Sequence, residues 1–151
     1  MNLALDIGAT NIRSALVDKT ILKQKIKTPT PKFQKEILEK IVYLIGQYKG
    51  YKKICIAIAG FEQKGKIKGA LNMDFNNVQL KKILSNKFKS PVYIQNDARS
   101  AALAELNYGV GKNLNNFVLL TLGTGIGGAV VINKKVYLGN GSAGEVGSMF
   151  I

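Results

Sequence analysis

The sequence contains no histidine, a single cysteine and only nine acidic residues. Without histidine there is no imidazole for a metal site or for serine–histidine catalysis. The single cysteine, Cys55, excludes an intrachain disulfide, and its apolar neighbours predict a small buried side chain. No apolar stretch is long enough to cross a membrane, and the first residues predict a strand instead of a signal peptide. We therefore expect a cytoplasmic protein without a membrane partner.

Because acidic residues are few, the net charge reaches +13, with 22 basic side chains. Such a charge attracts anions, so a basic nucleic-acid-binding module is one alternative. The lysines, however, are spread along predicted turns and helix faces, without an arginine-rich arm or a helix-turn-helix pattern. We interpret them as solvated surface and expect no specific nucleic-acid partner. The carboxylates are more informative, since Asp6, Asp97 and Glu145 lie in or beside glycine-rich and apolar segments.

A glycine-rich turn interrupts two apolar runs in the last third of the chain. The residues before it, Phe117–Leu120, are typical of a strand buried on both faces. In the turn, Gly123 and Gly125 allow the backbone to approach a ligand, and Thr124 adds a hydroxyl donor. Successive N–H groups in such a turn can surround an anion. An ordinary hairpin turn is the alternative, because isolated glycine-rich motifs are often false matches.

The same plan occurs at the amino terminus. An offset of about 115 positions, of the kind an internal repeat produces, places Gly8 on Gly123, Val17 on Ile132 and Ile21 on Val136. Both stretches follow the order strand, glycine turn, strand, polar turn, strand. Because the second turn also matches, we interpret the pair as a duplication. Two related hairpins can hold a polyphosphate from opposite sides.

The other segments alternate between strands and helices, and 46% of the 151 residues are hydrophobic, which is enough for a core. The predicted strands span residues 2–7, 12–17, 21–27, 54–59 and 91–95, and residues 117–132 and 135–138 are expected to form an antiparallel meander interrupted by the glycine turn. A small hairpin is expected at 66–68. We expect Thr30 to cap a first helix and Asn76 or Asn77 to cap a second, with a third helix at 98–106. The predicted class is α/β with a mixed sheet.

Two carboxylates lie where predicted strands end, the position at which open α/β sheets bind ligands. Asp97 precedes the third helix, so it either caps that helix or accepts a proton from a substrate hydroxyl. The neighbouring Asn96 can hydrogen-bond a polyol. Asp6 ends the first strand, where it either stabilises the turn or binds Mg²⁺, directly or through water.

Four segments, taken together, resemble motifs of the ROK family of sugar kinases and sugar-responsive repressors. Asp6–Asn11 and Leu122–Gly128 resemble its two phosphate motifs, Asn96–Glu105 its catalytic segment, and Gly139–Gly147 its glycine-rich segment with a sugar-binding Glu. The resemblance runs from end to end in the same order. It implies the actin/hexokinase-like (ribonuclease H-like) fold of duplicated lobes. We expect an amino-terminal lobe at residues 1–115 and the start of a second, truncated lobe at 116–151.

The resemblance implies a glucokinase-like enzyme that uses ATP and Mg²⁺ to phosphorylate a hexose or amino-hexose. Asp97 would be the general base, with Asn72, Asn96 and Glu145 on the sugar hydroxyls and Asp6 near Mg²⁺. The implied phosphate-binding residues are Asp6, Gly8, Ala9, Thr10, Asn11, Gly123, Thr124 and Gly125. Phosphoryl transfer depends chiefly on positioning and charge stabilisation, which such a set can supply.

The sequence departs from the family pattern after Glu145-Val146-Gly147. The family usually has a histidine there, which touches the sugar and often binds zinc, but this chain has Ser148. We therefore expect no structural zinc. A sugar-binding regulator without kinase activity is an alternative, although the Asn96–Asp97 pair and both phosphate turns favour the enzyme. Because most of the second lobe is expected to be absent, we expect residues 116–151 either to be covered, in a homo-oligomer or by a complementing carboxy-terminal fragment, or to be less ordered than residues 1–115.

Overall fold

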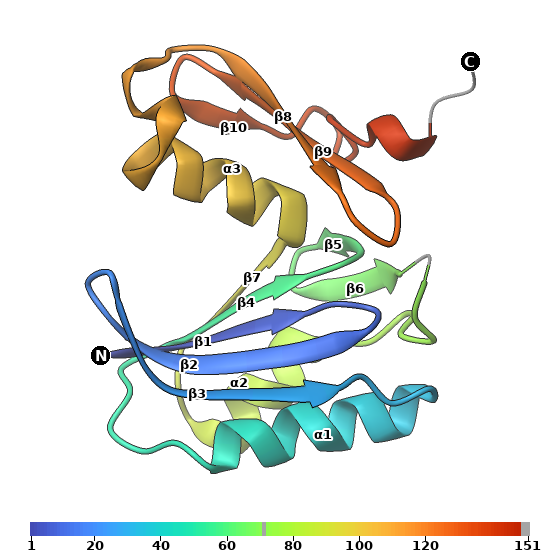
Figure 1. Ribbon diagram of the computed structural model, residues 1–151. Coiled ribbons are helices and arrows are strands. Elements are labelled where there is room, and N and C mark those ends of the chain that lie inside the picture. The colour runs from blue at the N-terminus through green and yellow to red at the C-terminus, as the bar shows by residue number, and fades with distance from the viewer. Residues whose placement is uncertain (71, 149–151) are drawn as a thin grey trace. The chain divides into compact units, whose positions relative to one another are not determined.

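The computed structural model describes residues 1–70 and 72–148, which form two compact units (Figure 1). The first unit is Met1–Gln95, and the second begins at Asn96. Each unit has its own sheet, so each is described by itself below. None of the described helices is long and apolar enough to span a membrane.

The first unit is built on a mixed five-stranded sheet in the order β3-β2-β1-β4-β7. β1 pairs antiparallel with β2 and parallel with β4. The elements of this unit are β1 (Asn2–Ile7), β2 (Asn11–Asp18), β3 (Ile21–Pro29), α1 (Gln34–Gly46), β4 (Ile54–Ile58), β5 (Phe61–Gln63), β6 (Lys66–Gly69), α2 (Leu80–Phe88) and β7 (Val92–Asn96). The predicted strands and the small β5–β6 hairpin are confirmed, with ends that differ by one or two residues.

Helices α1 and α2 bury one face of this sheet. Every second residue of β1 and β4 points into the core, as the pleat requires, and α1 supplies the matching apolar stripe. The side chains that are fully buried there include Leu3, Ile7, Ile12, Ile37, Ile41, Ile45, Ile54, Ile58, Leu80 and Leu84. Cys55 lies on the alternate face of β4 and is only half-buried, so it is less enclosed than its apolar neighbours predict.

Neither helix of the first unit has the side-chain cap that the sequence predicts. α1 begins after Phe33 and α2 after Gln79, and neither residue caps its helix through a side-chain hydrogen bond. The Asn76 side chain instead accepts a hydrogen bond from the N–H of Ala70. Thr30 lies too early to cap α1 and bonds to the turn between β1 and β2. Both predicted caps are therefore wrong, because these side chains find backbone partners elsewhere in the fold.

The second unit is a three-stranded antiparallel sheet, β10-β9-β8, with a helix on one face. Its elements are α3 (Asp97–Tyr108), the 3-10 turn η1 (Val110–Asn113), β8 (Phe117–Leu122), β9 (Ile126–Ile132), β10 (Lys135–Tyr137) and η2 (Val146–Ser148). Ala102 of α3 packs on Ala129 and Val131 of β9. This packing joins α3 to the second unit, so the compact units divide at Gln95/Asn96. The lobe boundary predicted after residue 115 rests on the sequence repeat, not on compactness. It stays a prediction.

The predicted repeat is visible in the strands. β1 and β8 have the same length, and β8 begins 115 positions after β1. In both copies the first strand pairs antiparallel with the second and the second with the third. The innermost pair is Ile7 with Ile12 in the first copy and Leu122 with Ile126 in the second. The second turn is therefore one residue shorter than the first.

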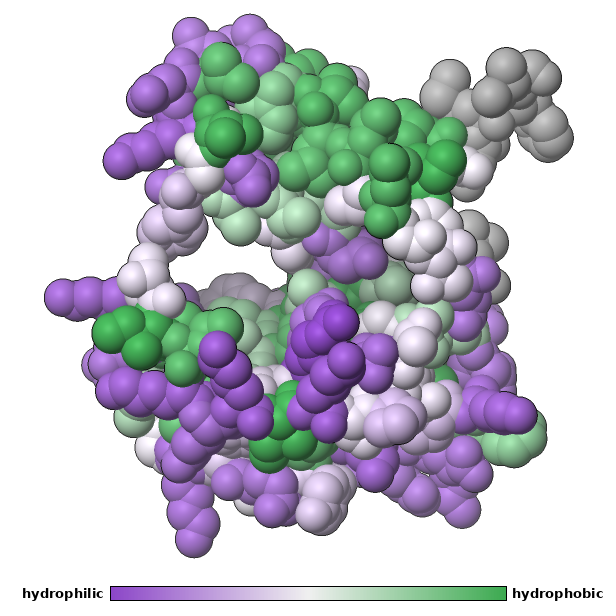
Figure 2. All heavy atoms as spheres, viewed as in Figure 1, coloured by the Kyte–Doolittle hydropathy of each residue, from purple (hydrophilic) through white to green (hydrophobic). Residues whose placement is uncertain are grey.

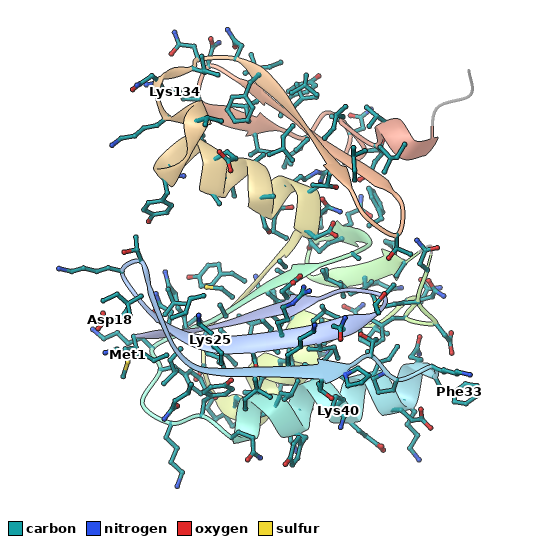
Figure 3. The ribbon with its side chains drawn as sticks, viewed as in Figure 1. Met1, Asp18, Lys25, Phe33, Lys40 and Lys134 are labelled. Carbon is teal, nitrogen blue, oxygen red and sulfur yellow. The ribbon has the colours of Figure 1, made fainter. Side chains whose placement is uncertain are left out.

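The two units differ strongly in charge. Residues 1–95 contain 18 basic and six acidic side chains, whereas residues 96–151 contain four basic and three acidic side chains. In the first unit the lysines project from several elements, such as Lys25 on β3 and Lys40 on α1 (Figure 3). This spread agrees with the interpretation of the lysines as solvated surface.

Candidate functional site

The first glycine-rich turn joins β1 to β2 and is held by backbone hydrogen bonds. The N–H of Gly8 donates to the carbonyl of Asn11 across 3.0 Å. Thr30, just after β3, donates its N–H to the carbonyl of Thr10 (3.1 Å) and its hydroxyl to that of Gly8 (2.6 Å). Among the described residues, the N–H groups of Ala9 and Thr10 have no acceptor. They are the donors this turn can offer to an anion.

Asp6, near the end of β1, forms an ion pair with Arg13 of β2, with 2.8 Å between Oδ2 and Nη1. Both side chains are about half exposed, so the pair contributes little to stability. No group of three or more potential metal-ligating side chains occurs within residues 1–70 and 72–148. A single carboxylate still fits Mg²⁺, which keeps several waters and is usually bound by one or two carboxylates plus substrate phosphates.

The second glycine-rich turn joins β8 to β9 and has the same character. The N–H of Gly123 donates to the carbonyl of Gly125 across 3.0 Å, and the Thr124 side chain is exposed. In the part of the chain that the structure describes, the N–H groups of Thr124 and Gly125 find no acceptor. Each copy of the repeat therefore presents two successive N–H groups at the tip of its first hairpin that find no partner within residues 1–70 and 72–148.

Two further glycines of this motif serve packing. A Cβ on Gly127 would lie 2.5 Å from Oγ1 of Thr121 and 3.3 Å from the Cβ of Ala98 on α3. A Cβ on Gly128 would lie 2.5 Å from the carbonyl oxygen of Gly144. Because adjacent strand residues point to opposite faces, Gly127 admits the start of α3 on one face of β9. Gly128 admits the segment around Gly144 on the other face.

Asn96 and Asp97 occupy the amino end of α3. The Oδ1 of Asn96 accepts the N–H of Arg99 across 3.0 Å, which makes the buried Asn96 the N-cap of the helix. The half-buried Asp97 is the first helical residue, and its Oδ1 accepts the N–H of Ala98 across 2.9 Å. The capping role considered for Asp97 therefore belongs to Asn96. The sugar contact predicted for Asn96 stays a prediction.

Arg99 is the buried charge of this region, with 3% of the residue exposed. Its Nη2 donates to the carbonyls of Gly141 (2.5 Å) and Ala143 (3.4 Å). The same Nη2 lies 3.9 Å from Oε1 of Glu145, within ion-pair distance but beyond a hydrogen bond. Its Nε is buried and has no hydrogen-bond partner among the described residues. Arg99 thus links the first turn of α3 to the segment that contains Glu145.

The carboxyl group of Glu145 lies in the field of both neighbouring charges. Burial raises the pKa of Glu145, the Arg99 guanidinium opposes that rise, and the Asp97 carboxylate adds to it. The Glu145 side chain is 36% exposed, so it remains open to a ligand. The second unit therefore brings together Asp97, Arg99 and Glu145, two carboxylates with a buried cation beside them.

Asn72 lies in the first unit on an exposed turn. The turn is anchored by Asn76, whose Oδ1 accepts the N–H of Ala70 across 3.1 Å, and by the buried side chain of Phe75. An exposed amide on an anchored turn is compatible with ligand contact. The predicted role of Asn72 in sugar binding stays a prediction.

Arg99 was not singled out by the sequence patterns, although one signal was available. It precedes buried Ala102 by three positions in an alanine-rich helix, so both residues face the same side. A charge on the buried side of a helix needs a specific partner. The packing role of Gly127 and Gly128 was also missed, because only the structure identifies the atoms that approach them.

A mixed sheet that opens with an antiparallel meander, followed by a repeat of that meander, defines the actin/hexokinase-like class of folds. The fold is confirmed by a solved structure, that of a ROK family glucokinase from Streptomyces griseus in complex with glucose and AMPPNP. It matches with a TM-score of 0.91 and 28% identity, over 99% of this chain and 50% of that one. Residues 2–151 match the model of the ROK family. The chain belongs to the ROK family.

Curated relatives include both enzymes and regulators. The glucokinase of Streptomyces coelicolor is 34% identical over 97% of this chain and 49% of its own length. The xylose repressor of Bacillus spizizenii is 33% identical over 99% of this chain and 42% of its own length. The chain thus spans about half the length of these relatives. Family membership supports a sugar kinase at the level of the family, which also contains repressors.

Proposed function

We propose that this chain provides the catalytic carboxylate and both phosphate turns of an ATP-dependent kinase for a hexose hydroxyl. The observation that carries the proposal is the group formed by Asp97, Arg99 and Glu145 beside the glycine-rich strand β9. A pair of carboxylates suits a polyol, because one can accept the proton of the reacting hydroxyl while the other binds its neighbours. The similarity to glucokinases supports the same assignment.

In the proposed reaction Asp97 is the general base. Its carboxylate accepts the proton of the sugar hydroxyl as that oxygen bonds to the γ-phosphorus of ATP and the bond to the ADP oxygen breaks. Asp97 is the first residue of α3, where the helix dipole favours a negative charge. Glu145 and Asn96 would orient the sugar, and the resemblance to the family assigns Asn72 a sugar contact as well.

Each of the two hairpin turns would bind phosphate oxygens. The unpaired N–H groups of Ala9 and Thr10 in one turn, and of Thr124 and Gly125 in the other, suit anionic oxygens. Asp6 would take part in holding Mg²⁺, which neutralises charge on the phosphates when bound. Arg13 would then release or share the Asp6 carboxylate.

A sugar-binding regulator is the second candidate, because a xylose repressor is about as similar to this chain as a glucokinase. Such a protein would bind sugar through the same carboxylates without transferring phosphate. Asp97 discriminates between the two candidates, since a general base is needed only by the enzyme.

We further propose that the outer face of β8 and β9 is covered in the working protein by a carboxy-terminal segment or by a second copy of the chain. Hydrophobic residues gather over these strands (Figure 2). The exposed side chains are Val118, Leu120, Leu122, Ile126 and Ile132. An apolar face of this kind favours association. Size-exclusion chromatography with light scattering tests it: a stable monomer whose β8 and β9 amides are strongly protected would contradict coverage by another chain.

The catalytic assignment is tested by Asp97→Asn in a protein that contains this chain. The amide keeps the oxygen that accepts the Ala98 N–H but cannot act as the base. We expect phosphorylation to slow by roughly 10²–10⁴-fold while sugar binding is retained. Asp18→Asn, an exposed aspartate at the end of β2, is the matched control and should leave the rate unchanged. A variant at Asp97 as fast as the parent would remove the proposed base.

A further inference from the structure

Arg99 is unusual among the basic residues of the chain, because it alone belongs to the buried class among the described residues. A buried guanidinium loses its hydration and must recover that loss from local partners. Arg99 has three: two carbonyls of the segment that follows β10 and the carboxylate of Glu145. All of them lie on one stretch of chain, so the arginine fastens that stretch to the first turn of α3.

The fastened stretch has little regular structure of its own. Between Tyr137 and Val146 it is a series of turns, in which Gly139, Gly141 and Gly144 have positive φ angles of 52°, 110° and 91°. Glycine adopts such angles without the steric cost that a Cβ adds, and it also leaves a chain with more conformational freedom. The bonds from Arg99 therefore help to give Glu145, at the end of this segment, a defined position.

We propose that Arg99 is a positioning residue: it holds the Gly139–Glu145 segment on α3 and keeps the carboxylate of Glu145 beside Asp97. The link to sugar recognition rests on the proposed function, but the positioning itself does not. Arg99 contacts the carbonyls of Gly141 and Ala143 and lies within ion-pair distance of Glu145, so its proposed effect on the sugar passes through Glu145. Because Asp97 is also an anion, the guanidinium offsets the repulsion that two neighbouring carboxylates would otherwise experience.

A positioning role for Arg99 differs from a purely structural one in its effect on the ionisation of Glu145. An anchor would need only the hydrogen bonds to the carbonyls of Gly141 and Ala143. A positioning residue must also act on the charge of Glu145. Arg99→Lys keeps the positive charge but loses the planar fork of donors, whereas Arg99→Gln loses the charge. The two variants therefore separate the two effects.

The experiment is a carboxyl-carbon NMR titration of this chain, together with amide hydrogen exchange. In Arg99→Gln we expect the pKa of Glu145 to rise above that of the parent, and in Arg99→Lys to stay close to it. In both variants the hydrogen-bonded amides of Gly141 and Glu145 should exchange about 10- to 100-fold faster, as expected when bonds from a charged donor are lost.

The matched control is Arg13→Gln, which removes an arginine from an exposed ion pair in the first unit. It should leave the pKa of Glu145 and the exchange of residues 139–145 unchanged. If Arg99→Gln moves the Glu145 titration no more than this control does, the positioning role is excluded. The same holds if exchange of the segment stays at the parent rate in both Arg99 variants.

A second variant keeps the test decisive should the Arg99 variants fail to fold. Glu145→Gln leaves both carbonyl bonds to Arg99 intact, and we expect it to shift the guanidinium nitrogen resonances of Arg99. Glu105→Gln, further along α3, should not shift them. If the Arg99 guanidinium resonances are the same in Glu145→Gln and Glu105→Gln, the proposal is overturned. None of these measurements requires phosphoryl transfer. If the proposed kinase function is wrong, no phosphorylated sugar will form, but the titration and exchange results will still be obtained.

Discussion

The strands β1–β3 and β8–β10 share one sequence pattern, but different faces of the two meanders are covered by helices. Alternate side chains of β1 are at most 2% exposed, because α1 and α2 cover them: Leu3, Leu5 and Ile7. The residues 115 positions later are 59%, 56% and 82% exposed: Val118, Leu120 and Leu122. In the second unit α3 packs instead on the alternate set, which includes Phe117 and Leu119.

This difference shows what an apolar alternation predicts and what it leaves open. The pattern indicates that a strand face is suited to burial, but not which element buries it. In the first unit that face is enclosed by the helices that follow. In the second, the alanine-rich α3 approaches from the other side, where the small residues Gly127 and Ala129 admit it.

The sharpest test of the comparison is a pair of equivalent truncations. Leu5→Ala opens a cavity in an enclosed core and should lower the free energy of unfolding by about 2–5 kcal/mol. In the isolated monomeric chain, Leu120→Ala, at the matching position of β8, should change it by no more than about 0.5 kcal/mol, since its side chain is exposed there. Urea denaturation, followed by hydrogen exchange in each sheet, measures both. Equal losses would mean that the outer face of β8 is covered in solution.

The next largest effect is expected in the glycine-rich motif of the second copy. Gly128→Ala places a methyl group against the carbonyl of Gly144, and such overpacking typically costs about 1–3 kcal/mol. Gly123→Ala in the same motif meets no atom within 4 Å and has no left-handed φ, so it is the matched control. Amide exchange across β9 and residues 139–145 should accelerate only in Gly128→Ala. A similar response in both variants would refute the packing role.

A smaller effect separates the two hairpin turns. Thr30→Val removes the hydroxyl that donates to Gly8 but keeps the backbone bond to Thr10. We expect a loss of about 0.5–1.5 kcal/mol, the usual net value of a hydrogen bond, and faster exchange around residues 8–11. Thr124→Val, at the exposed tip of the second turn, should leave stability unchanged. Unchanged exchange around residues 8–11 in Thr30→Val would show that the hydroxyl does not hold the first turn.

The smallest effect is a pH dependence confined to the second unit. Because burial raises the pKa of Glu145 in the folded state, ionising this group costs more in the folded than in the unfolded chain. The stability it contributes is present below its unfolded pKa and is lost as the pH rises through the folded value. Glu145→Gln should therefore gain stability relative to the parent as the pH increases across this range. A stability difference that is flat with pH in thermal unfolding would contradict this sign.

Much of the fold could be predicted because its signals are local. The strand at residues 2–7 is confirmed to the residue, and the repeat located the second meander, since alternation and turn glycines are read over a few positions. The helix caps were wrong at Thr30 and Asn76, because their polar side chains bond to backbone from other elements. The assigned roles of Asp97 and Glu145 remain predictions, although the structure brings the two carboxylates near each other.

The sequence by itself determined the repeat, the two glycine turns, the mixed α/β class and the membership suggested by four ordered motifs. All of these depend on residue type and short spacing. Only the tertiary structure decided which face of each meander is covered, why Gly127 and Gly128 are glycines, and that Arg99 is buried against Gly141 and Ala143. Those partners lie 42 and 44 positions away in the chain. Contacts at such separations depend on how the strands return along the sheet, and a local pattern does not encode them.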